Sequence, residues 1–451
     1  YNIGVGFNAG YSITTGVRNT LIGGLTGDTL TAGLDNTALG YNTLSTETSG
    51  ARSVAVGSEA LATQNVGSGT AVYNSALGYA AGNAVTSGIN NTFIGGRAGL
   101  LTTTASNNTS VGSNSLRANT TGHTNSSFGH DSMRFNTTGA QNVGIGQQAL
   151  HNNTNASNNT AVGFKAGLSV TTGAGNTFIG ALVGDANTDG VANVAVGGDG
   201  TYAALGADTR GKFSTAIGFG ALTAQNFTSV TDSGNTAVGY FAGGVNATGK
   251  FNTYVGSAAG DDSNDGNENV ALGYAALGAN HGDGNTAVGK QALTACTGGS
   301  NTALGLVAGL GVTSGSNNIL LGFNAGRAGS PGGNVTTGSN IVGIGGDGIS
   351  AAHIQVDWTV ASDQRDKTDF TALDLGLDFV KALAPVTYKW DKRSKYGDKT
   401  ADDYDLNAQS PDGTHKEDWL DIGFKAQEVE ALEQAAGYNK SNKTNLVSSH
   451  T

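Results

Sequence analysis

The sequence predicts an all-β repeat fold, a β-solenoid of short coils, followed by a small α+β domain. A five-residue motif that ends in glycine recurs twenty times, almost in phase, along the first 346 residues. Glycine provides 73 of the 451 residues and proline only 3, a composition that weakens helices and favours turns. Charged residues concentrate in the last 90 positions, so a second kind of domain follows the repeat.

The motif is N-x-x-x-G, as in NTALG, which ends at Gly40. Of the nineteen intervals between the motif glycines, thirteen are 17 residues, two are 16, three are 21 and one is 23. Such a period is too short for a helical hairpin and is typical of one solenoid coil. We expect two short strands and two turns per coil, with the extra residues of the longer coils bulging outward as loops.

Within each coil, x-[AFL]-[VIL]-G should form a strand with alternating inward and outward side chains. We expect G-[YF]-x-A-[GL] to form the second strand, with small residues that let neighbouring backbones approach closely. The recurring asparagine should stack as a ladder of amides that satisfy each other. We also expect a ladder rather than sugar-stacking sites from the aromatic residues that follow the motif glycines: Phe7, Tyr41, Tyr79, Phe164, Phe219, Tyr240, Tyr274 and Phe323.

The core of one coil is thin, because it holds only about five or six small apolar side chains. A stable solenoid then needs a long stack, or several chains that share a core, and here we expect both. At ~4.8 Å per coil, the nineteen intervals give a rod about 90 Å long.

The composition changes near Ser362. Residues 362–451 carry 29 of the 57 charged residues but only 5 glycines. We therefore divide the chain into a repeat over 1–346, a neck over 347–361 and a C-terminal domain over 362–451. In that domain, LGLDFVKALAP predicts a helix that ends before Pro385, VTYKW a strand, and IGFKAQEVEAL a strand and a helix. The three tryptophans fall in this part of the chain and suggest a compact core.

Composition also excludes several classes of function. The net charge of -11 argues against binding to nucleic acid or to an anionic membrane surface, and no apolar run approaches the roughly 18 residues that insertion into a membrane requires. The single cysteine, Cys296, allows no intrachain disulfide and no cysteine-based metal site, and we expect a small side chain in a turn. Because Tyr1 lies inside a repeat and Met133 is the one methionine, we expect the sequence to be a piece of a longer polypeptide.

One segment resembles the start of a calcium loop, because DANTDG places Asp185, Asn187 and Asp189 at alternate positions. A looser copy has Asp261, Ser263 and Asp265. The bidentate glutamate of such loops is absent from both, so we favour solvated turns, keep Ca²⁺ as the weaker hypothesis and expect no cofactor. The histidines show none of the spacings typical of zinc sites.

The repeat resembles the head repeats of trimeric autotransporter adhesins and of many phage tail fibres. The resemblance covers residues 1–346 and rests on N-[ST]-x-[AV]-[IV]-G, although adhesin heads usually have a slightly shorter period. It implies a left-handed parallel β-roll in which three chains pack side by side, and therefore a homotrimer.

The spaced blocks SDQRDK, LAPVTYKW and GFKAQEV resemble the intramolecular chaperone domain of endosialidase-type phage tailspikes and fibres, a family of self-cleaving serine peptidases. The resemblance covers Ser362 to Leu432. It implies that Ser362 is a nucleophile activated by Lys367 and that the bond from Ala361 to Ser362 is cut. The alternative is that Ser362 caps a turn and Lys367 is a solvated charge.

The resemblance implies orienting or structural roles for Asp363 and Arg365. Asp366 precedes Lys367 where the family favours an apolar residue, and an adjacent anion raises the pKa of a lysine and slows the reaction. Lys425 also replaces a usually apolar residue. Family members continue into a long helix near L-V-x-A-I-Q-E-L, whereas this sequence reads LVSSHT, so we expect the chaperone domain to be incomplete.

These observations favour a homotrimeric phage tail fibre used for host attachment, located in the virion tail and therefore extracellular. Its partners would be other tail or fibre proteins and a glycan or protein receptor on the host surface. One alternative is a bacterial surface or secreted trimeric adhesin with the same chaperone. A second is a glycan depolymerase, which needs paired carboxylates in a groove. We expect no turnover enzyme, only single-turnover autoproteolysis.

Overall fold

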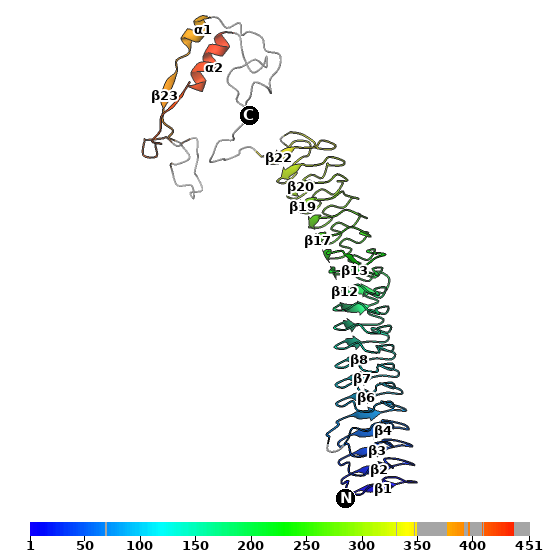
Figure 1. Ribbon diagram of the computed structural model, residues 1–451. Coiled ribbons are helices and arrows are strands. Elements are labelled where there is room, and N and C mark those ends of the chain that lie inside the picture. Colours follow the sequence, from blue (N-terminus) through cyan, green and yellow to red (C-terminus); the bar gives the residue numbers. More distant parts are fainter. Residues whose placement is uncertain are drawn as a thin grey trace. The chain divides into compact units, whose positions relative to one another are not determined.

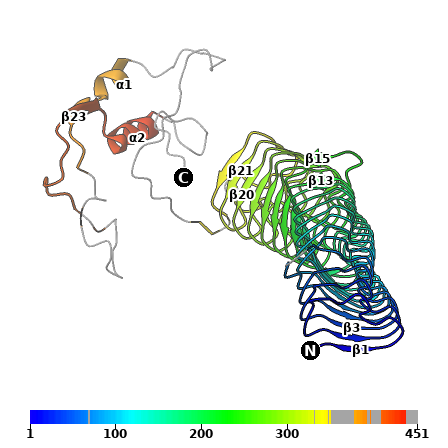
Figure 2. The same ribbon diagram turned by 60° about the horizontal axis from the view of Figure 1, so that its bottom comes forward.

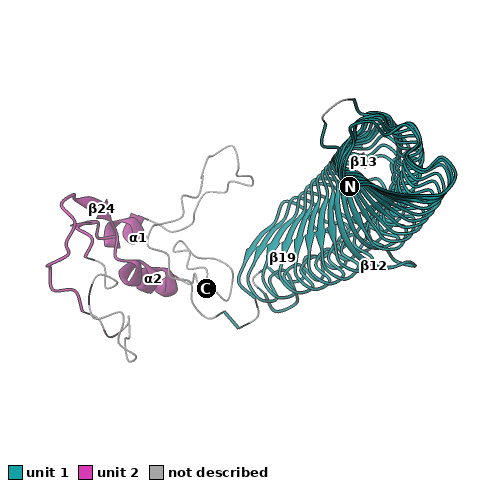
Figure 3. Ribbon diagram, turned by 90° about the horizontal axis from the view of Figure 1, so that it is seen from below, with its two compact units in different colours: residues 1–353 teal, residues 354–451 magenta. Residues whose placement is uncertain are grey.

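The structure is a computed structural model that describes residues 1–67, 70–330, 332–346, 348–349, 377–391, 396, 408 and 410–436. The chain divides into two compact units, Tyr1–His353 and Ile354–Thr451 (Figure 3). The predicted catalytic residues lie outside the described residues, and so does most of the predicted neck.

The first unit is a β-solenoid in which every coil adds one short strand to a single sheet of twenty parallel strands (Figures 1 and 2). Each strand pairs in register with the strand of the next coil, for example Leu21 with Ala38. The predicted parallel solenoid is therefore confirmed. Its strands are β1 (Ile3–Val5), β2 (Thr20–Ile22), β3 (Thr37–Leu39), β4 (Val54–Val56), β5 (Ser75–Leu77), β6 (Thr92–Ile94), β7 (Thr109–Val111), β8 (Ser126–Phe128), β9 (Val143–Ile145), β10 (Thr160–Val162), β11 (Thr177–Ala181), β12 (Val194–Asp199), β14 (Thr215–Ile217), β16 (Thr236–Val238), β17 (Thr253–Val255), β18 (Val270–Leu272), β19 (Thr286–Val288), β20 (Thr302–Leu304), β21 (Ile319–Leu321) and β22 (Val342–Ile344).

The second strand expected in each coil does not form. In the segment G-Y-N-T-L, Asn42 and Leu44 have φ values of 52° and 53°, in the left-handed region, which an extended strand does not contain. The segment still bonds to both neighbouring coils, because Asn42 N–H donates to Gly24 O at 3.0 Å and Leu44 N–H donates to Ala60 O at 3.1 Å. A regular coil therefore consists of one strand and a series of hydrogen-bonded turns.

The asparagine ladder forms as predicted and does more than stack. In a regular coil the backbone N–H of Asn142 donates to Oδ1 of Asn125 at 3.0 Å, and its Nδ2 donates to the same oxygen at 3.2 Å. The same Nδ2 donates to Ala156 O at 2.8 Å, fourteen residues later in its own coil. One buried amide thus closes its own coil and links it to the coil before it. We call the turn that supplies this carbonyl the closing corner.

The inward side chains alternate in size between neighbouring positions. Fifteen of the twenty strands place a small residue at their centre, and in seven of these coils a leucine follows six residues later, as Leu44 follows Ala38. Five strands instead place a large residue there, and in each case the later position is glycine in that coil and in the preceding coil. The five are Leu21, Phe93, Phe178, Tyr254 and Leu320.

Phe93 illustrates the complementarity. A Cβ at Gly99 would overlap its ring, and a Cβ at Gly82 would lie 2.7 Å from Cδ2 of the same ring. These glycines therefore make room for large inward side chains, whereas we had expected them to serve close approach of the backbones. The motif glycine does serve that purpose: Gly23 has φ +132°, and a Cβ there would overlap the carbonyl of Gly40 in the next coil.

The longer coils carry their extra residues at three different corners. In two of them the extra residues precede the closing of the coil, at 198–201 and 327–332, and Asn193 and Asn318 still close onto Gly211 O and Gly338 O. In two others the extra residues lie in the closing corner itself, within 65–73 and 226–234. Thr228, Ser229 and Val230 are exposed, as expected for an outward loop, and β13 (Gly211–Lys212) pairs with β15 (Thr231–Asp232) at its base.

The described part of the second unit is a small α+β arrangement. It contains α1 (Leu377–Ala382), β23 (Val386–Tyr388), β24 (Asp421–Gly423) and α2 (Ala426–Ala435), and the two strands pair antiparallel. The predicted order of helix, strand, strand and helix is therefore found. Among the described residues the expected tryptophan core is not found, because Trp390 and Trp419 are 42% and 66% exposed, and Trp358 lies outside these residues.

A large side chain at the centre of a strand is matched by glycine six residues later, and we call this complementarity the size rule. It predicts how core substitutions combine. We expect Phe93→Ala to lower the free energy of unfolding by about 3–5 kcal/mol, because it leaves a cavity between Gly82 and Gly99. Adding Gly99→Leu recreates the pairing of Ala38 with Leu44 and should recover part of that loss, whereas Gly99→Leu alone should be destabilising. Thermal unfolding of the four chains would measure the coupling, and purely additive effects would contradict the rule.

Candidate interaction face and C-terminal site

The solenoid presents one continuous outer face, which we define as the first and third residues of its twenty strands. The central residue of each strand points inward and is buried in every coil after the first. The third residue points outward and is Val, Ile, Leu or Phe in all twenty strands. The first residue is Thr, Ser, Val or Ile. The outer face therefore contains no charged residue.

Many outer-face side chains are exposed although they are apolar. Leu39, Leu77, Ile145 and Leu304 have exposed fractions of 44%, 51%, 41% and 52%. Single exposed apolar residues are normal, whereas a contiguous apolar surface marks a site of interaction. Because the same position is apolar in every coil, the exposed residues form one stripe along the solenoid. This stripe is a candidate interaction surface of the described residues.

The predicted aromatic ladder is present only locally. Phe219 and Tyr240 stack with centroids 5.7 Å apart and an interplanar angle of 8°, and Tyr202 and Phe241 join them at the corner beside the outer face. Elsewhere the ladder is interrupted, because Gly24, Ser58, Gly96 and Ser113 occupy the same position in other coils.

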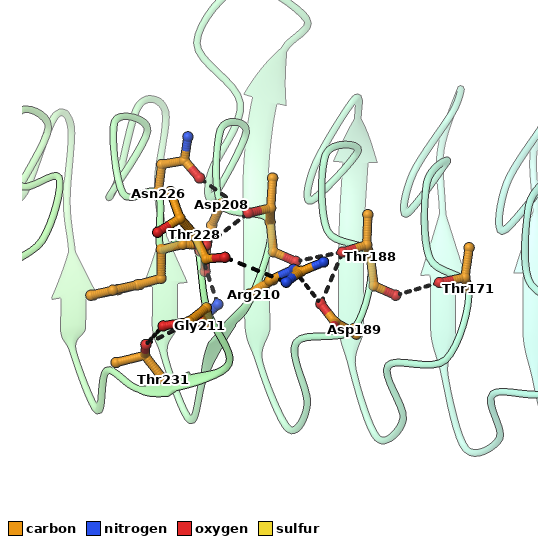
Figure 4. A network of polar contacts seen from close by, with 12 residues as sticks. Thr171, Thr188, Asp189, Asp208, Arg210, Gly211, Asn226, Thr228 and Thr231 are labelled. Carbon is orange, nitrogen blue, oxygen red and sulfur yellow. Dashed lines mark hydrogen bonds and ion pairs between the residues drawn. The ribbon is translucent and has the colours of Figure 1, made fainter.

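The structure separates the three residues of the candidate calcium loop. Asn187 is 2% exposed and lies in the interior of its coil. Asp189 lies on the surface, where it accepts a hydrogen bond from Thr188 Oγ1 at 2.9 Å and pairs with Arg210 at 3.3 Å (Figure 4). Partial burial raises the pKa of Asp185. No group of three or more His, Cys, Asp or Glu side chains that could hold a metal ion occurs among the described residues.

A threonine ladder follows the surface beside this pair. Thr171 Oγ1 donates to Thr188 O at 3.1 Å, and Thr188 Oγ1 donates to Thr209 O at 3.1 Å (Figure 4). The same bond joins Thr120 to Thr137 and Thr137 to Thr154 in earlier coils. The threonine hydroxyl groups therefore link successive coils to one another.

Two polar side chains meet inside the solenoid without a hydrogen bond. Tyr254 Oη and His281 Nε2 are buried and have no hydrogen-bond partner among the described residues, and the centroids of the two rings lie 6.1 Å apart. Burial lowers the pKa of His281 to about 4 and raises that of Tyr254, because both environments disfavour charge. Cys296 is also buried, and burial raises the pKa of its thiol, which makes it unreactive, as the sequence suggests for a packed side chain.

The predicted cleavage site cannot be built from the described residues. Ala361, Ser362, Asp363, Arg365 and Lys367 all lie outside them, so their proposed roles rest on the sequence. The two later blocks of the chaperone pattern are described. LAPVTYKW follows α1 directly and supplies strand β23, and GFKAQEV supplies the end of β24 and the start of α2.

Lys425 has an electrostatic role at the start of α2. Its Nζ lies 2.7 Å from Oε1 of Glu428, and both side chains are exposed. The replacement of an apolar residue by lysine therefore gives a solvated ion pair, and such pairs contribute little to stability.

Comparison with known proteins identifies the C-terminal segment. Residues 362–438 match the model of the family described as chaperone of endosialidase. This match, together with the β-solenoid, supports the predicted organisation of a tail-fibre-like protein with an endosialidase-type chaperone domain. Comparisons with curated proteins and with solved structures give no match. None of the described helices is long and apolar enough to span a membrane.

The outer face is a candidate functional feature that our sequence reasoning did not single out. Its signal was present, because the third strand position is apolar in all twenty repeats. We had used that position only to recognise a strand. What identifies the face is the exposure of these side chains once the inward positions have filled the core.

His281 should make the solenoid sensitive to acid. A histidine whose folded pKa is about 4 contributes full stability above its unfolded pKa of about 6.5 and loses that contribution as the pH falls. Asp265 and Asp283 act in the opposite direction, because they raise the pKa of His281, but burial dominates. Between pH 7 and pH 4.5 the loss should be about 2–3 kcal/mol.

We expect His281→Gln to lose less stability than the wild type over the same pH range. Thermal unfolding of both full chains at pH 7 and pH 4.5 would measure this difference. Equal losses in the two chains would show that His281 stays neutral or is not buried in solution.

Proposed function

We propose that the protein is the shaft of a homotrimeric phage tail fibre that serves in host attachment, assembled with the help of its C-terminal chaperone domain. The single observation that carries this proposal is the uncharged outer face along all twenty coils. A surface of this length would be a liability on a monomer, since exposed, flat, apolar sheet faces promote aggregation.

The chemistry of the outer face suits a second and a third copy of the same chain. Every coil offers a small apolar contact, and fully burying one Val, Ile or Leu side chain contributes roughly 1.5–3 kcal/mol. Copies aligned in parallel would bring like positions together, threonine beside threonine and leucine beside leucine. Three chains, rather than two, follow from the resemblance of both parts of the sequence to trimeric fibres.

The chaperone domain supports a fibre more directly than the solenoid does. Chains with long repeats must start assembly in register, and a chaperone at one end gives them a common starting point. A bacterial surface or secreted adhesin with the same chaperone remains our alternative, because it would use the same outer face. For a glycan depolymerase we find no supporting observation in the described residues.

Cross-linking tests the outer face. We expect Ile145→Cys, on the outer face of β9, to give disulfide-linked chains on oxidation, because equivalent residues would face each other across the trimer. Asn155→Cys, an exposed turn position of the same coil, is the control and should not cross-link. The native Cys296 is buried and should not interfere. For the uncleaved chain of 45.0 kDa, light scattering should give three times that mass; a folded monomer without cross-links would overturn the proposal.

We further propose that the assembled trimer cuts the bond between Ala361 and Ser362. The Ser362 hydroxyl would attack the Ala361 carbonyl carbon while Lys367 takes its proton, and the proton then passes to the departing amine of Ser362. Water hydrolyses the resulting ester. The reaction requires a neutral lysine, and desolvation on assembly would supply one.

Mass spectrometry of the assembled protein tests cleavage. We expect Ser362→Ala and Lys367→Ala to leave the chain intact. Asp366→Leu should speed cleavage, because it removes an anion that keeps Lys367 protonated. An intact wild-type trimer that Asp366→Leu does not change would leave a chaperone without protease activity.

A further inference from the structure

Two coils depart from the asparagine ladder in the same way. Ser53 and Ser214 stand where the ladder has asparagine, and each begins a coil with four extra residues in the closing corner. In a regular coil that corner supplies the carbonyl that accepts the ladder amide. Here the corner turns outward: a Cβ at Gly67 would meet nothing within 4 Å, and Thr228, at the equivalent position, is exposed. An asparagine at Ser53 or Ser214 would therefore lack its acceptor.

A glutamine replaces the missing amide in the first of these coils. Gln64 Nε2 donates to Ser53 Oγ at 3.0 Å and to Glu47 Oε2 at 3.0 Å. Its Oε1 accepts from Nδ2 of Asn74, the next ladder residue, at 2.9 Å. All four side chains are fully buried. Gln64 thus bridges the gap that Ser53 leaves in the ladder.

The second coil repeats this network with an aspartate in place of the glutamate. Gln225 Nε2 donates to Ser214 Oγ at 3.1 Å and to Asp208 Oδ2 at 2.8 Å, and its Oε1 accepts from Asn235 Nδ2 at 2.9 Å. These four side chains are also fully buried. The spacings are identical in both coils: six residues from acid to serine, eleven from serine to glutamine and ten from glutamine to asparagine.

The buried acid also caps the closing corner of the preceding coil. Glu47 Oε1 accepts from Gly50 N–H at 2.6 Å, and Asp208 Oδ1 accepts from Gly211 N–H at 3.0 Å (Figure 4). Burial raises the pKa of Asp208, and its hydrogen bonds act in the opposite direction. These hydrogen bonds, from a glutamine amide and a backbone N–H, stabilise the ionised form of the carboxylate.

The bases of the two loops match as well. Thr48 Oγ1 donates to Asn65 Oδ1 at 3.0 Å, and Thr209 Oγ1 donates to Asn226 Oδ1 at 3.1 Å (Figure 4). The returning chain pairs in parallel with the preceding coil, through Ala71 with Ala51 in one case and through β15 with β13 in the other. The other two long coils, whose loops lie at different corners, retain the ladder residues Asn193 and Asn318.

We propose that the acid, serine, glutamine and asparagine form a loop socket, a buried unit that replaces one rung of the ladder and lets a coil carry an exchangeable surface loop at its closing corner. The socket occurs in the two coils whose extra residues lie in the closing corner. It does not occur in the two long coils whose extra residues lie elsewhere. The loop tips, at Gly67 and at 228–230, are then the positions where the surface of the shaft can change without disturbing its core. This inference does not depend on whether the shaft belongs to a fibre or to an adhesin.

Exchange of a tip tests the first half of the proposal. A ten-residue Gly/Ser segment inserted between Ser229 and Val230 should change the melting temperature by no more than about 2 °C. The same segment inserted between Thr138 and Gly139, in the closing corner of a regular coil, should lower it by several degrees, because the acceptor for Asn125 Nδ2 is lost. Equal effects at the two positions would overturn the proposal.

Transplantation tests the second half. Residues 137–141 of the regular coil that begins at Asn125 are replaced by the sequence of 226–234, with or without Asn119→Asp, Asn125→Ser and Asn136→Gln. We expect the loop alone to lower the melting temperature and the three substitutions to recover at least half of the loss. If the substitutions give no recovery in this loop graft, the buried network is not what holds the loop. Gln225→Ala in the native coil should destabilise in both cases and serves only as a control for the assay.

Discussion

The solenoid depends on one buried amide per coil. In a regular coil the asparagine before the strand closes its own coil through Nδ2, and its Oδ1 accepts from the next coil, as Asn125 Oδ1 accepts from the backbone N–H and Nδ2 of Asn142. A buried polar group is costly unless it is fully paired, so this arrangement holds only if the chain returns to the same point in every coil. The nearly constant period of the sequence and the in-register sheet both follow from that requirement.

The volumes of the inward side chains determine which residues occupy the other core positions of the coil. A ring or leucine that points inward occupies space belonging to two coils, so the facing position is glycine in both, as at Gly82 and Gly99 around Phe93. The inward residues fill the core of the solenoid, so the outward side chains of the strands have no part of their own chain to pack against. Their apolar character is the basis of our proposal that further copies of the chain cover them, and it connects the thin core to the apolar outer face.

Much of the solenoid fold could be predicted from sequence, because a pattern that is ambiguous in one coil becomes clear when it recurs twenty times. The period, the parallel strand, the asparagine ladder and the order of elements after Leu377 were all predictable. The second strand was predicted wrongly, because residues such as Leu44 adopt left-handed backbone conformations that L-residues usually avoid and that packing imposes here. The separation of Asn187 from Asp189 depends on which side of a turn faces the core, and a spacing of two residues does not reveal that. The roles of Ser362 and Lys367 remain predictions from the sequence.

The unequal lengths of the coils have a consequence for alignment between copies. A stack of identical coils has translational symmetry, so a neighbouring copy displaced by one coil would match almost as well as an aligned one. The intervals of 16, 21 and 23 residues break that symmetry, because no displacement by whole coils maps their pattern onto itself. The irregular coils therefore define a single register, in which two parallel copies place every long or short coil beside its equivalent.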